Sequence, residues 1–183
     1  NGTPIIAQTI KIARQSKLFK RIIVSTDAPK IAEIAVKYGA EVPFLRSKDL
    51  SNDYAPITKV IIDTIHKIKS FKEKFHFCIY PTSILINQKD LKNAFLKIKR
   101  TKSDFICPIA KFESSPLRSF SIKNLFINFN WPKNQMKRSQ DLKELYYDTG
   151  SFLIYRTEAL LKMNSKKILP KRSTFILLKK KLI

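Results

Sequence analysis

Four clusters of polar side chains follow strand-like apolar runs in this chain, and they are its best candidates for chemistry. Carboxylates, hydroxyls and arginines at strand ends can accept hydrogen bonds from a ribose or base, or pair with a phosphate or carboxylate. The plainer role for each cluster is a helix cap or an ordinary turn. The clusters are Ser25-Thr26-Asp27; Arg46 with Asp49, Asp53 and Tyr54; Pro81-Thr82-Ser83; and a late set at 114–118, 138–142 and 146–150.

The elements that must position these clusters alternate between strands and helices. The run Phe75–Ser83 suits a buried strand, and Pro81 ends it because proline offers no N–H. Periodicity predicts three more strands in the first part of the chain, at Arg21–Ser25, Glu41–Leu45 and Asp104–Pro108. Helices are predicted between them at 3–16, 29–38, 55–69 and 89–100, with Gly39 closing the second.

This rhythm predicts an α/β fold with a mainly parallel sheet flanked by helices. The carboxyl ends of parallel strands meet at one edge, so the four clusters are expected to line one polar crevice there. Two arginines and several acids suit an anionic, hydroxyl-rich small molecule. After Lys111 the pattern changes to strand-like pieces at 120–122 and 125–130, a helical turn at 140–145, a strand at 150–156 and a helix at 157–163.

The composition is that of a globular protein with an unusual charge. The chain has 183 residues, is 44% hydrophobic, and carries a formal charge of +22 from 36 basic residues. Lysines, not arginines, supply most of this charge and lie on every amphipathic segment, so a solvated lysine-rich surface is favoured over a nucleic-acid site. No run approaches the roughly 20 apolar residues of a membrane span.

Several familiar kinds of site are missing from the sequence. It contains no G-x-G-x-x-G, no P-loop and no G-x-S-x-G motif. His66 and His76 stand apart, and neither is assigned a metal or base role. Cys78 and Cys107 each lie in an apolar run and are expected to be buried free thiols in a reducing, cytoplasmic setting.

A series of landmarks in a fixed order resembles the sugar-activating cytidylyltransferases. The opening Asn1-Gly2-Thr3-Pro4-Ile5-Ile6 resembles a segment that follows their signature loop. Ile23–Asp27, then Arg46 with 50–53, and then Tyr80–Ser83 resemble the next landmarks. The segments 115–120, 140–142 and 147–150 look most like the branch that acts on pseudaminic acid, whereas sialic-acid enzymes usually carry Asn-Gly at the position of Thr149-Gly150.

The resemblance implies a three-layer, Rossmann-like nucleotide-diphospho-sugar transferase fold. It implies the conversion of CTP and a nonulosonic acid into a CMP-sugar and pyrophosphate, for cell-surface glycan biosynthesis. Mg²⁺ and a homodimer would accompany this reaction. By position, the residues expected near the nucleotide are Ser25, Asp27, Arg46 and Asp53, and those expected near the sugar are Pro81, Thr82, Ser83, Arg118, Gln140, Tyr147, Asp148 and Thr149.

The chain also departs from the family pattern at both ends. By the resemblance, a first strand with a basic, glycine-bearing phosphate loop would precede Asn1, and acidic Mg²⁺ ligands would occur late in the chain. The expectation is therefore a truncated cytidylyltransferase-like domain over 1–165, lacking its first strand, with a basic tail at 166–183. No turnover is expected from these 183 residues alone, and no catalytic residue or metal ligand is assigned.

Two alternatives remain open at this point. One is the same family acting on another acid sugar, such as sialic or legionaminic acid. The other is a basic α/β module that binds nucleic acid, for which a steep salt dependence of oligonucleotide binding would be the sign.

Overall fold

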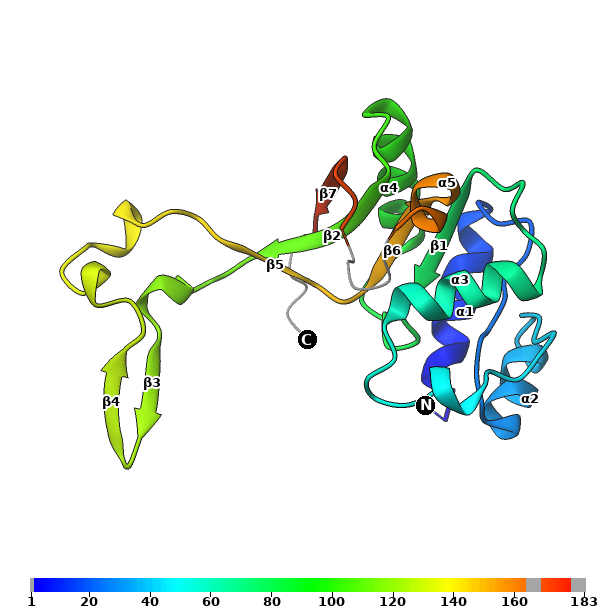
Figure 1. The fold of residues 1–183 in the computed structure, drawn as a ribbon, viewed down its shortest axis with the longest axis horizontal. Helices are drawn as coiled ribbons and strands as arrows, with labels where there is room; N and C mark the ends of the chain where they lie inside the picture. The colour runs from blue at the N-terminus through cyan, green and yellow to red at the C-terminus, as the bar shows by residue number, and fades with distance from the viewer. Residues whose placement is uncertain (1, 164–168, 179–183) are drawn as a thin grey trace. The chain divides into compact units, whose positions relative to one another are not determined.

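The computed structural model describes residues 2–163 and 169–178, which belong to two compact units (Figure 1). Unit 1 is formed by the segments 1–108 and 150–176, and unit 2 by 109–149 with the residues from 177 onward. The chain passes from unit 1 into unit 2 within strand β2 (Phe105–Lys111). Among the described residues, no helix is long and apolar enough to cross a membrane.

The four predicted helices of unit 1 all form, because each has one apolar face to bury. They are α1 (Ile5–Ser16), α2 (Pro29–Lys37), α3 (Ile57–Lys67) and α4 (Gln88–Arg100). Helix α4 begins with a capping box, in which Asn87 and Asp90 exchange side-chain and backbone hydrogen bonds. Gly39 follows the end of α2 with φ +89°, and the Arg14 guanidinium lies so close that a Cβ at this position would be 2.4 Å from its Nη1. This confirms Gly39 as the C-terminal glycine.

The central sheet of unit 1 is antiparallel, so the prediction of a mainly parallel sheet was wrong. Strand β6 (Phe152–Arg156) lies between β1 (Phe75–Ile79) and β2, and runs antiparallel to both. Helix α4 joins β1 to β2 as expected, but leaves room between them for a strand from much later in the chain. Sequence periodicity reports local structure and carries no information on such a distant partner.

Parallel pairing is found where the first two strands were predicted. Segments 21–25 and 41–45 do not form full strands, but two isolated parallel bridges join them, Ile23 to Glu41 and Thr26 to Leu45. The Val24 N–H donates to the Glu41 carbonyl at 2.9 Å.

Helices cover both faces of the sheet in unit 1. On one face, Ile61 and Ile65 of α3 and Leu160 of α5 (Thr157–Leu161) bury a cluster with Phe105, Leu153 and Tyr155. On the other, Phe95 of α4 packs edge-on against Phe75 of β1, with ring centroids 5.5 Å apart. This arrangement confirms the three layers.

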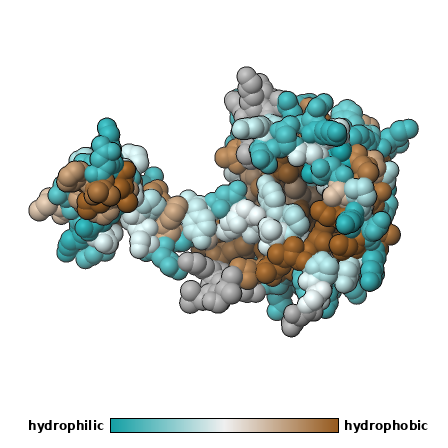
Figure 2. All heavy atoms as spheres, turned by 90° about the horizontal axis from the view of Figure 1, so that it is seen from below, coloured by the Kyte–Doolittle hydropathy of each residue, from teal (hydrophilic) through white to brown (hydrophobic). Residues whose placement is uncertain are grey.

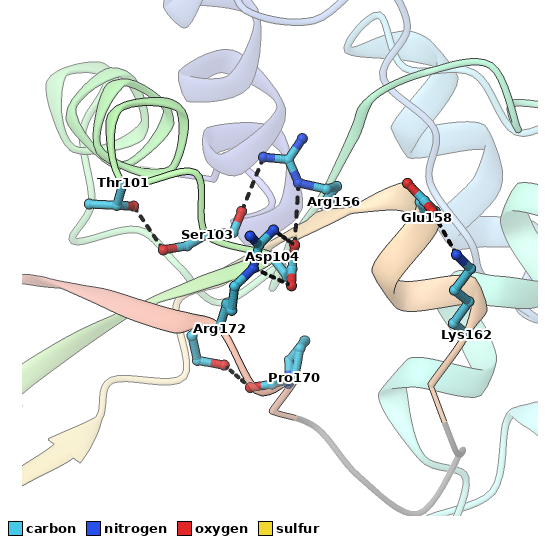
Figure 3. Close-up of polar contacts among 9 residues, drawn as sticks. Thr101, Ser103, Asp104, Arg156, Glu158, Lys162, Pro170 and Arg172 are labelled. Carbon is cyan, nitrogen blue, oxygen red and sulfur yellow. Dashed lines mark hydrogen bonds and ion pairs between the residues drawn. The ribbon is translucent and has the colours of Figure 1, made fainter.

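A short strand in the predicted basic tail is tied to unit 1 by ion pairs (Figure 3). Strand β7 (Ser173–Leu177) pairs with β2, and Arg172, just before it, contacts Asp104 through Nη2 and Nε at 2.9 and 3.1 Å. Arg156 approaches the same carboxylate at 3.4 Å. The hydrogen bond from Arg172 is the main cause of a lowered pKa of Asp104. The rest of the predicted tail, at 166–168 and 179–183, lies outside the described residues.

Unit 2 contains short elements and little buried surface. Strands β3 (Phe120–Lys123) and β4 (Phe126–Phe129) form a hairpin, and β5 (Tyr146–Asp148) pairs with the outer part of β2. The helical turn predicted at 140–145 is a 3-10 turn at Ser139–Asp141. Within 109–149 only Ala110 and Asn134 are buried. Figure 2 shows apolar atoms gathered at the surface of the hairpin, on the left of the picture.

Candidate functional site

The first two polar clusters meet in unit 1 where the two parallel segments end. The Arg46 N–H donates to the Thr26 carbonyl at 2.8 Å, which brings the end of one segment beside the end of the other. The Thr26 hydroxyl is buried and accepts the Ala28 N–H at 3.2 Å, which fixes the turn into α2. The first two clusters therefore lie side by side at the ends of two bridged segments, and their membership of one site stays a prediction.

The Arg46 side chain is held in place and still has donors to offer. Its Nε donates to the Ser51 hydroxyl at 3.0 Å, and Ser51 in turn donates to the Ser47 carbonyl at 2.8 Å. Its Nη2 lies 3.7 Å from the Asp27 carboxylate. Because a guanidinium has five N–H donors, a positioned Arg46 can bind an anion while it keeps these contacts.

The capping roles considered for the two acids are wrong. The N-cap residue of α2 is Ala28 and that of α3 is Pro56, and neither helix start has a side-chain cap. Asp27 instead faces Arg46, and Asp53 lies exposed in the turn that precedes α3. Ser25 has a buried hydroxyl oxygen with no hydrogen-bond partner in the described part of the chain. The carboxylates of Asp27 and Asp53 are thus not used as helix caps and are available to a ligand.

The turn after β1 is anchored to two other elements. The Pro81 carbonyl accepts from the Thr9 hydroxyl of α1 at 2.8 Å, and the buried Ser83 hydroxyl donates to the Ser151 carbonyl at 2.5 Å. Thr82 between them is exposed. The proton of Ser83 is therefore used within the fold, whereas the Thr82 side chain is accessible.

Strand β1 carries a histidine and a cysteine that are poorly suited to catalysis. His76 lies between two hydroxyls, with Nε2 2.8 Å from Ser70 Oγ and Nδ1 2.9 Å from Thr157 Oγ1, and its pKa is lowered mainly by burial. Burial raises the pKa of Cys78 to about 12, which leaves the thiol protonated. Cys78 and Cys107 are free thiols, as predicted, but each residue is only partly buried.

The late polar clusters lie in unit 2. Arg118 is exposed, and its Nη1 makes one long contact, 3.4 Å, with the Lys137 carbonyl. Arg138 pairs through two hydrogen bonds, at 2.8 and 3.0 Å, with Asp141, next to Gln140. In the described residues no carboxylate pairs with Arg118, so Arg118 is the better candidate for an external acid.

The remaining predicted residues lie on or next to β5. Tyr147 is opposite Ala110 of β2, and its ring centroid is 4.9 Å from that of Phe112. Asp148 is opposite Ile109, and Thr149 follows. Because these residues belong to unit 2 and the first three clusters to unit 1, the single crevice joining all four remains a prediction.

The sequence reasoning missed the residues that support the site. Thr9 and Ser51 hold the Pro81 turn and Arg46 through hydrogen bonds that depend on how loops and helices pack. No local sequence pattern around either residue predicts these hydrogen bonds.

The described residues form no ready magnesium site. No group of three or more His, Cys, Asp or Glu side chains among them is placed to hold a metal ion. Mg²⁺ prefers several oxygen ligands in octahedral geometry. Mg²⁺ is commonly held by only one or two carboxylates together with substrate phosphates and water, so this donor count does not test the divalent metal that the family typically uses.

Comparison with known proteins decides the family. The cytidylyltransferase family model matches residues 1–181. The chain belongs to the cytidylyltransferase family. This family consists of CTP-using enzymes, so the prediction of a CTP-dependent nucleotidyltransferase is confirmed.

Individual relatives of this cytidylyltransferase act on different substrates. A pseudaminic acid cytidylyltransferase of Campylobacter jejuni is 36% identical over 163 residues, which cover 87% of this chain and 70% of the relative. A CMP-N,N'-diacetyllegionaminic acid synthase of Legionella pneumophila is 39% identical over 95 residues, 51% of this chain and 41% of that protein.

Solved structures support the fold. A CMP-2-keto-3-deoxy-manno-octonic acid synthetase complexed with CTP superposes with a TM-score of 0.67, over 96% of this chain and 80% of that one, at 12% identity. At this identity the likeness shows the α/β fold.

Proposed function

We propose that this cytidylyltransferase chain serves to activate pseudaminic acid with CTP, giving the CMP-sugar and pyrophosphate. The observation that carries the proposal is the 36% identity to the Campylobacter jejuni enzyme over 87% of the chain. The segments at 115–120, 140–142 and 147–150, which resemble the pseudaminic acid branch, support it. The legionaminic acid relative matches half of the chain and gives the second candidate.

The nucleotide is proposed to bind at the polar turns of unit 1. Arg46, held by Ser51, would place its free N–H groups against a phosphate of CTP. Asp27, about half exposed beside Arg46, would accept hydrogen bonds from the ribose or base, with Ser25 and Asp53 at the same end of the segments. Charge neutralisation by an arginine with few internal partners suits a triphosphate.

The acid sugar is proposed to bind at the residues that the family resemblance assigned to it. Arg118 would pair with its carboxylate, since no internal acid occupies this guanidinium among the described residues. Thr82 would offer its accessible hydroxyl, while Pro81 and Ser83 shape the turn. The residues proposed to complete the sugar side are Gln140, Tyr147, Asp148 and Thr149.

The reaction is a nucleotidyl transfer. The anomeric hydroxyl of the sugar attacks the α-phosphorus, a new P–O bond forms, and the bond to the pyrophosphate leaving group breaks. The hydroxyl proton is released as the CMP-sugar forms. In such transfers, catalysis consists mainly of aligning the two substrates and stabilising the charge on the phosphate oxygens.

Calorimetric titration of the chain with CTP tests the nucleotide side directly, because it measures binding separately from turnover. We expect Arg46→Ala to weaken CTP binding by roughly tenfold, as for loss of a charged hydrogen bond. Arg100→Ala, on the last turn of α4, removes the same charge elsewhere and is the matched control. Equal affinities of the two variants would contradict the role of Arg46.

Titration with three acid sugars tests the substrate. We expect pseudaminic acid to bind more tightly than legionaminic or sialic acid, and Arg118→Ala to reduce that binding by about tenfold. Unchanged sugar binding by Arg118→Ala would refute its role, and a preference for legionaminic acid would favour the second candidate. Assays of CMP-sugar formation with the same acids give the independent readout. Tight binding of arbitrary oligonucleotides that weakens steeply with salt would instead support the nucleic-acid module.

A further inference from the structure

Three loops of unit 1 each lead from a helix into the start of a strand, and they lie together at one edge. The loops are 17–20 after α1, 68–74 after α3 and 101–104 after α4. The Lys20 ammonium lies 3.0 Å from the Glu73 carboxylate, which joins the first two loops. At the end of β6 the Thr157 N–H donates to the Lys74 carbonyl, and the preceding N–H donates to the Asp104 carbonyl, which joins the second and third. The end of α1, the start of β1 and the end of α4 accordingly lie at the top of unit 1 in Figure 1.

This edge carries a high density of positive charge. The segments 17–20, 69–74 and 99–102 contain eight basic residues and one acid, and all eight basic side chains are exposed. We call this set the basic edge: Lys17, Lys20, Lys69, Lys72, Lys74, Lys99, Arg100 and Lys102. Glu73 is paired with Lys20, and Asp104 nearby is paired with Arg172 at 2.9 Å. Within the described residues no carboxylate pairs with the other seven cations, so their charge can attract an anionic partner.

Three of these lysines stand at helix ends where the backbone favours glycine. Lys17, Lys69 and Lys102 have φ of 55°, 55° and 51°, in the left-handed region that a residue without a Cβ adopts most easily. Helices α2, α3 and α4 all close with an N–H that donates to the carbonyl five residues earlier, at 3.0, 3.1 and 3.2 Å. In α2 the left-handed residue is Gly39, where the Arg14 guanidinium leaves no room for a Cβ. A lysine at the other ends is less favourable for the fold than glycine, which indicates a role for its charge.

The helix dipole does not account for the basic edge. A cation near the C-terminus of a helix is favoured, but this effect falls off within the last turn. Lys20 lies four residues beyond the end of α1, and Lys72 and Lys74 lie five and seven residues beyond the end of α3. Between the lysines of the second loop, Phe71 is 45% exposed, with its ring centroid 5.0 Å from that of His66. Lysines beside an exposed aromatic ring are typical of surfaces that bind anionic membranes.

We propose that the basic edge binds the surface of an anionic lipid bilayer. Seven of its eight cations are lysines, which attract headgroups as compact point charges, whereas nucleic-acid recognition favours the planar fork of arginine. Three neighbouring loops present these charges along one edge, so they can meet a planar surface together. The Phe71 ring would enter the interfacial layer, and no membrane-spanning segment is needed.

The orientation of β1 gives this contact a consequence for the rest of unit 1. The basic edge precedes the first residue of β1, Phe75, and the Pro81 turn follows the last, Ile79. A chain bound to a bilayer through the basic edge would therefore keep the Pro81 turn away from the lipid and open to solution. This inference does not depend on the proposed reaction.

Co-sedimentation of the 183-residue chain with lipid vesicles is the direct test. We expect binding to vesicles of phosphatidylserine and phosphatidylcholine, little binding to phosphatidylcholine alone, and a loss of affinity as salt is raised. The triple variant Lys17→Gly, Lys69→Gly, Lys102→Gly should weaken binding by roughly 100-fold, at about fivefold for each lysine. Because glycine suits the backbone at these helix ends, the thermal midpoint of this variant should stay or rise.

A matched control removes the same charge from the opposite ends of the helices. Lys30, Lys59 and Lys89 are exposed and lie in the first turns of α2, α3 and α4. The triple variant Lys30→Ala, Lys59→Ala, Lys89→Ala should weaken vesicle binding by less than about fivefold. Phe71→Ser should weaken it by about tenfold at every salt concentration, because this variant loses apolar contact and no charge.

Several outcomes would overturn the proposal. The first is a chain that does not bind the phosphatidylserine vesicles, and the second is an equal loss of binding in the two triple variants, which would reduce the effect to net charge. Binding to arbitrary oligonucleotides and not to vesicles, lost in the lysine-to-glycine variant, would assign the basic edge to nucleic acid instead. CTP titration of each variant is expected to be unchanged, so failure of this inference is distinct from failure of the proposed reaction.

Discussion

The two units of this molecule are stabilised in different ways. Unit 1 places aromatic and branched side chains in complete burial, among them Phe105, Phe152 and Tyr155. Unit 2 buries Ala110 and Asn134 within 109–149, and its contacts are mostly hydrogen bonds and ion pairs at the surface. Free energy in unit 1 comes mainly from removing apolar area from water, whereas unit 2 gains little in this way. Unit 1 is therefore stabilised by its own core, whereas unit 2 has little buried apolar area to stabilise it.

The difference between the two units predicts that the most destabilising substitutions lie in the core of unit 1. Phe105→Ala should lower the free energy of unfolding by about 4 kcal/mol, because it leaves a cavity against Tyr155 and α3. Phe126→Ala, at a side chain that is 75% exposed in unit 2, should change it by less than about 0.5 kcal/mol. Urea unfolding followed by circular dichroism measures both. Similar losses from the two variants would erase the distinction between the units.

A smaller effect is expected where unit 1 buries polar groups. The Thr157 hydroxyl donates to the Glu73 carbonyl at 2.5 Å and therefore accepts from the protonated Nδ1 of His76. Thr157→Val leaves both partners unsatisfied and should cost about 2 kcal/mol. Thr101→Val, at an exposed hydroxyl after α4, is the control. Equal unfolding midpoints for the two variants would show that the His76 network contributes nothing.

Acid should act on unit 1 through the ion pairs of Figure 3. Asp104 has a lowered pKa in the folded chain, so the stability it contributes is present above its ordinary value of about 3.9 and is lost as pH falls below it. Asp104→Asn should remove about 1 kcal/mol at neutral pH and flatten this loss in acid. Unfolding midpoints measured from pH 7 to pH 3 give the comparison. A parallel pH profile for variant and parent would argue against the pairing with Arg172.

The smallest effect is expected from the ion pair in unit 2. Arg138 pairs with Asp141 on the surface, where water competes for both groups. Arg138→Ala should leave the unfolding midpoint unchanged within error, in the same urea titration. A clear loss of stability would indicate that unit 2 is held together more by its ion pairs than we infer.

Local structure could be predicted from the sequence to a useful degree. The ends of α1 to α4 fall within about two residues of the predicted ones, because each helix has a clear apolar face. The strand order could not be predicted, since β6 chooses its place between β1 and β2 by packing at long range. Strands β5 and β7 were missed because each is short and lies in polar or lysine-rich sequence.

The candidate site was predictable from the sequence only where it depends on local patterns. Asp27 and Arg46 follow two neighbouring strand-like segments, and their meeting at 3.7 Å follows from the parallel pairing that the pattern indicated. The supporting roles of Thr9 and Ser51 depend on loop and helix packing, which leaves no periodic trace. The commitment of the Ser83 proton to Ser151 is likewise a contact between segments far apart in the chain.

The course of the chain through β2 makes unit 2 an insertion between β2 and β6, two adjacent strands of unit 1. The insertion begins after β2 and ends before β6, and these two strands pair with each other. A change in the length of the insertion therefore has little effect on the core. Doubling the length of a closed loop costs only about 0.6 kcal/mol in chain entropy. The insertion can therefore be lengthened, shortened or rebuilt over evolution while the core of unit 1 stays as it is.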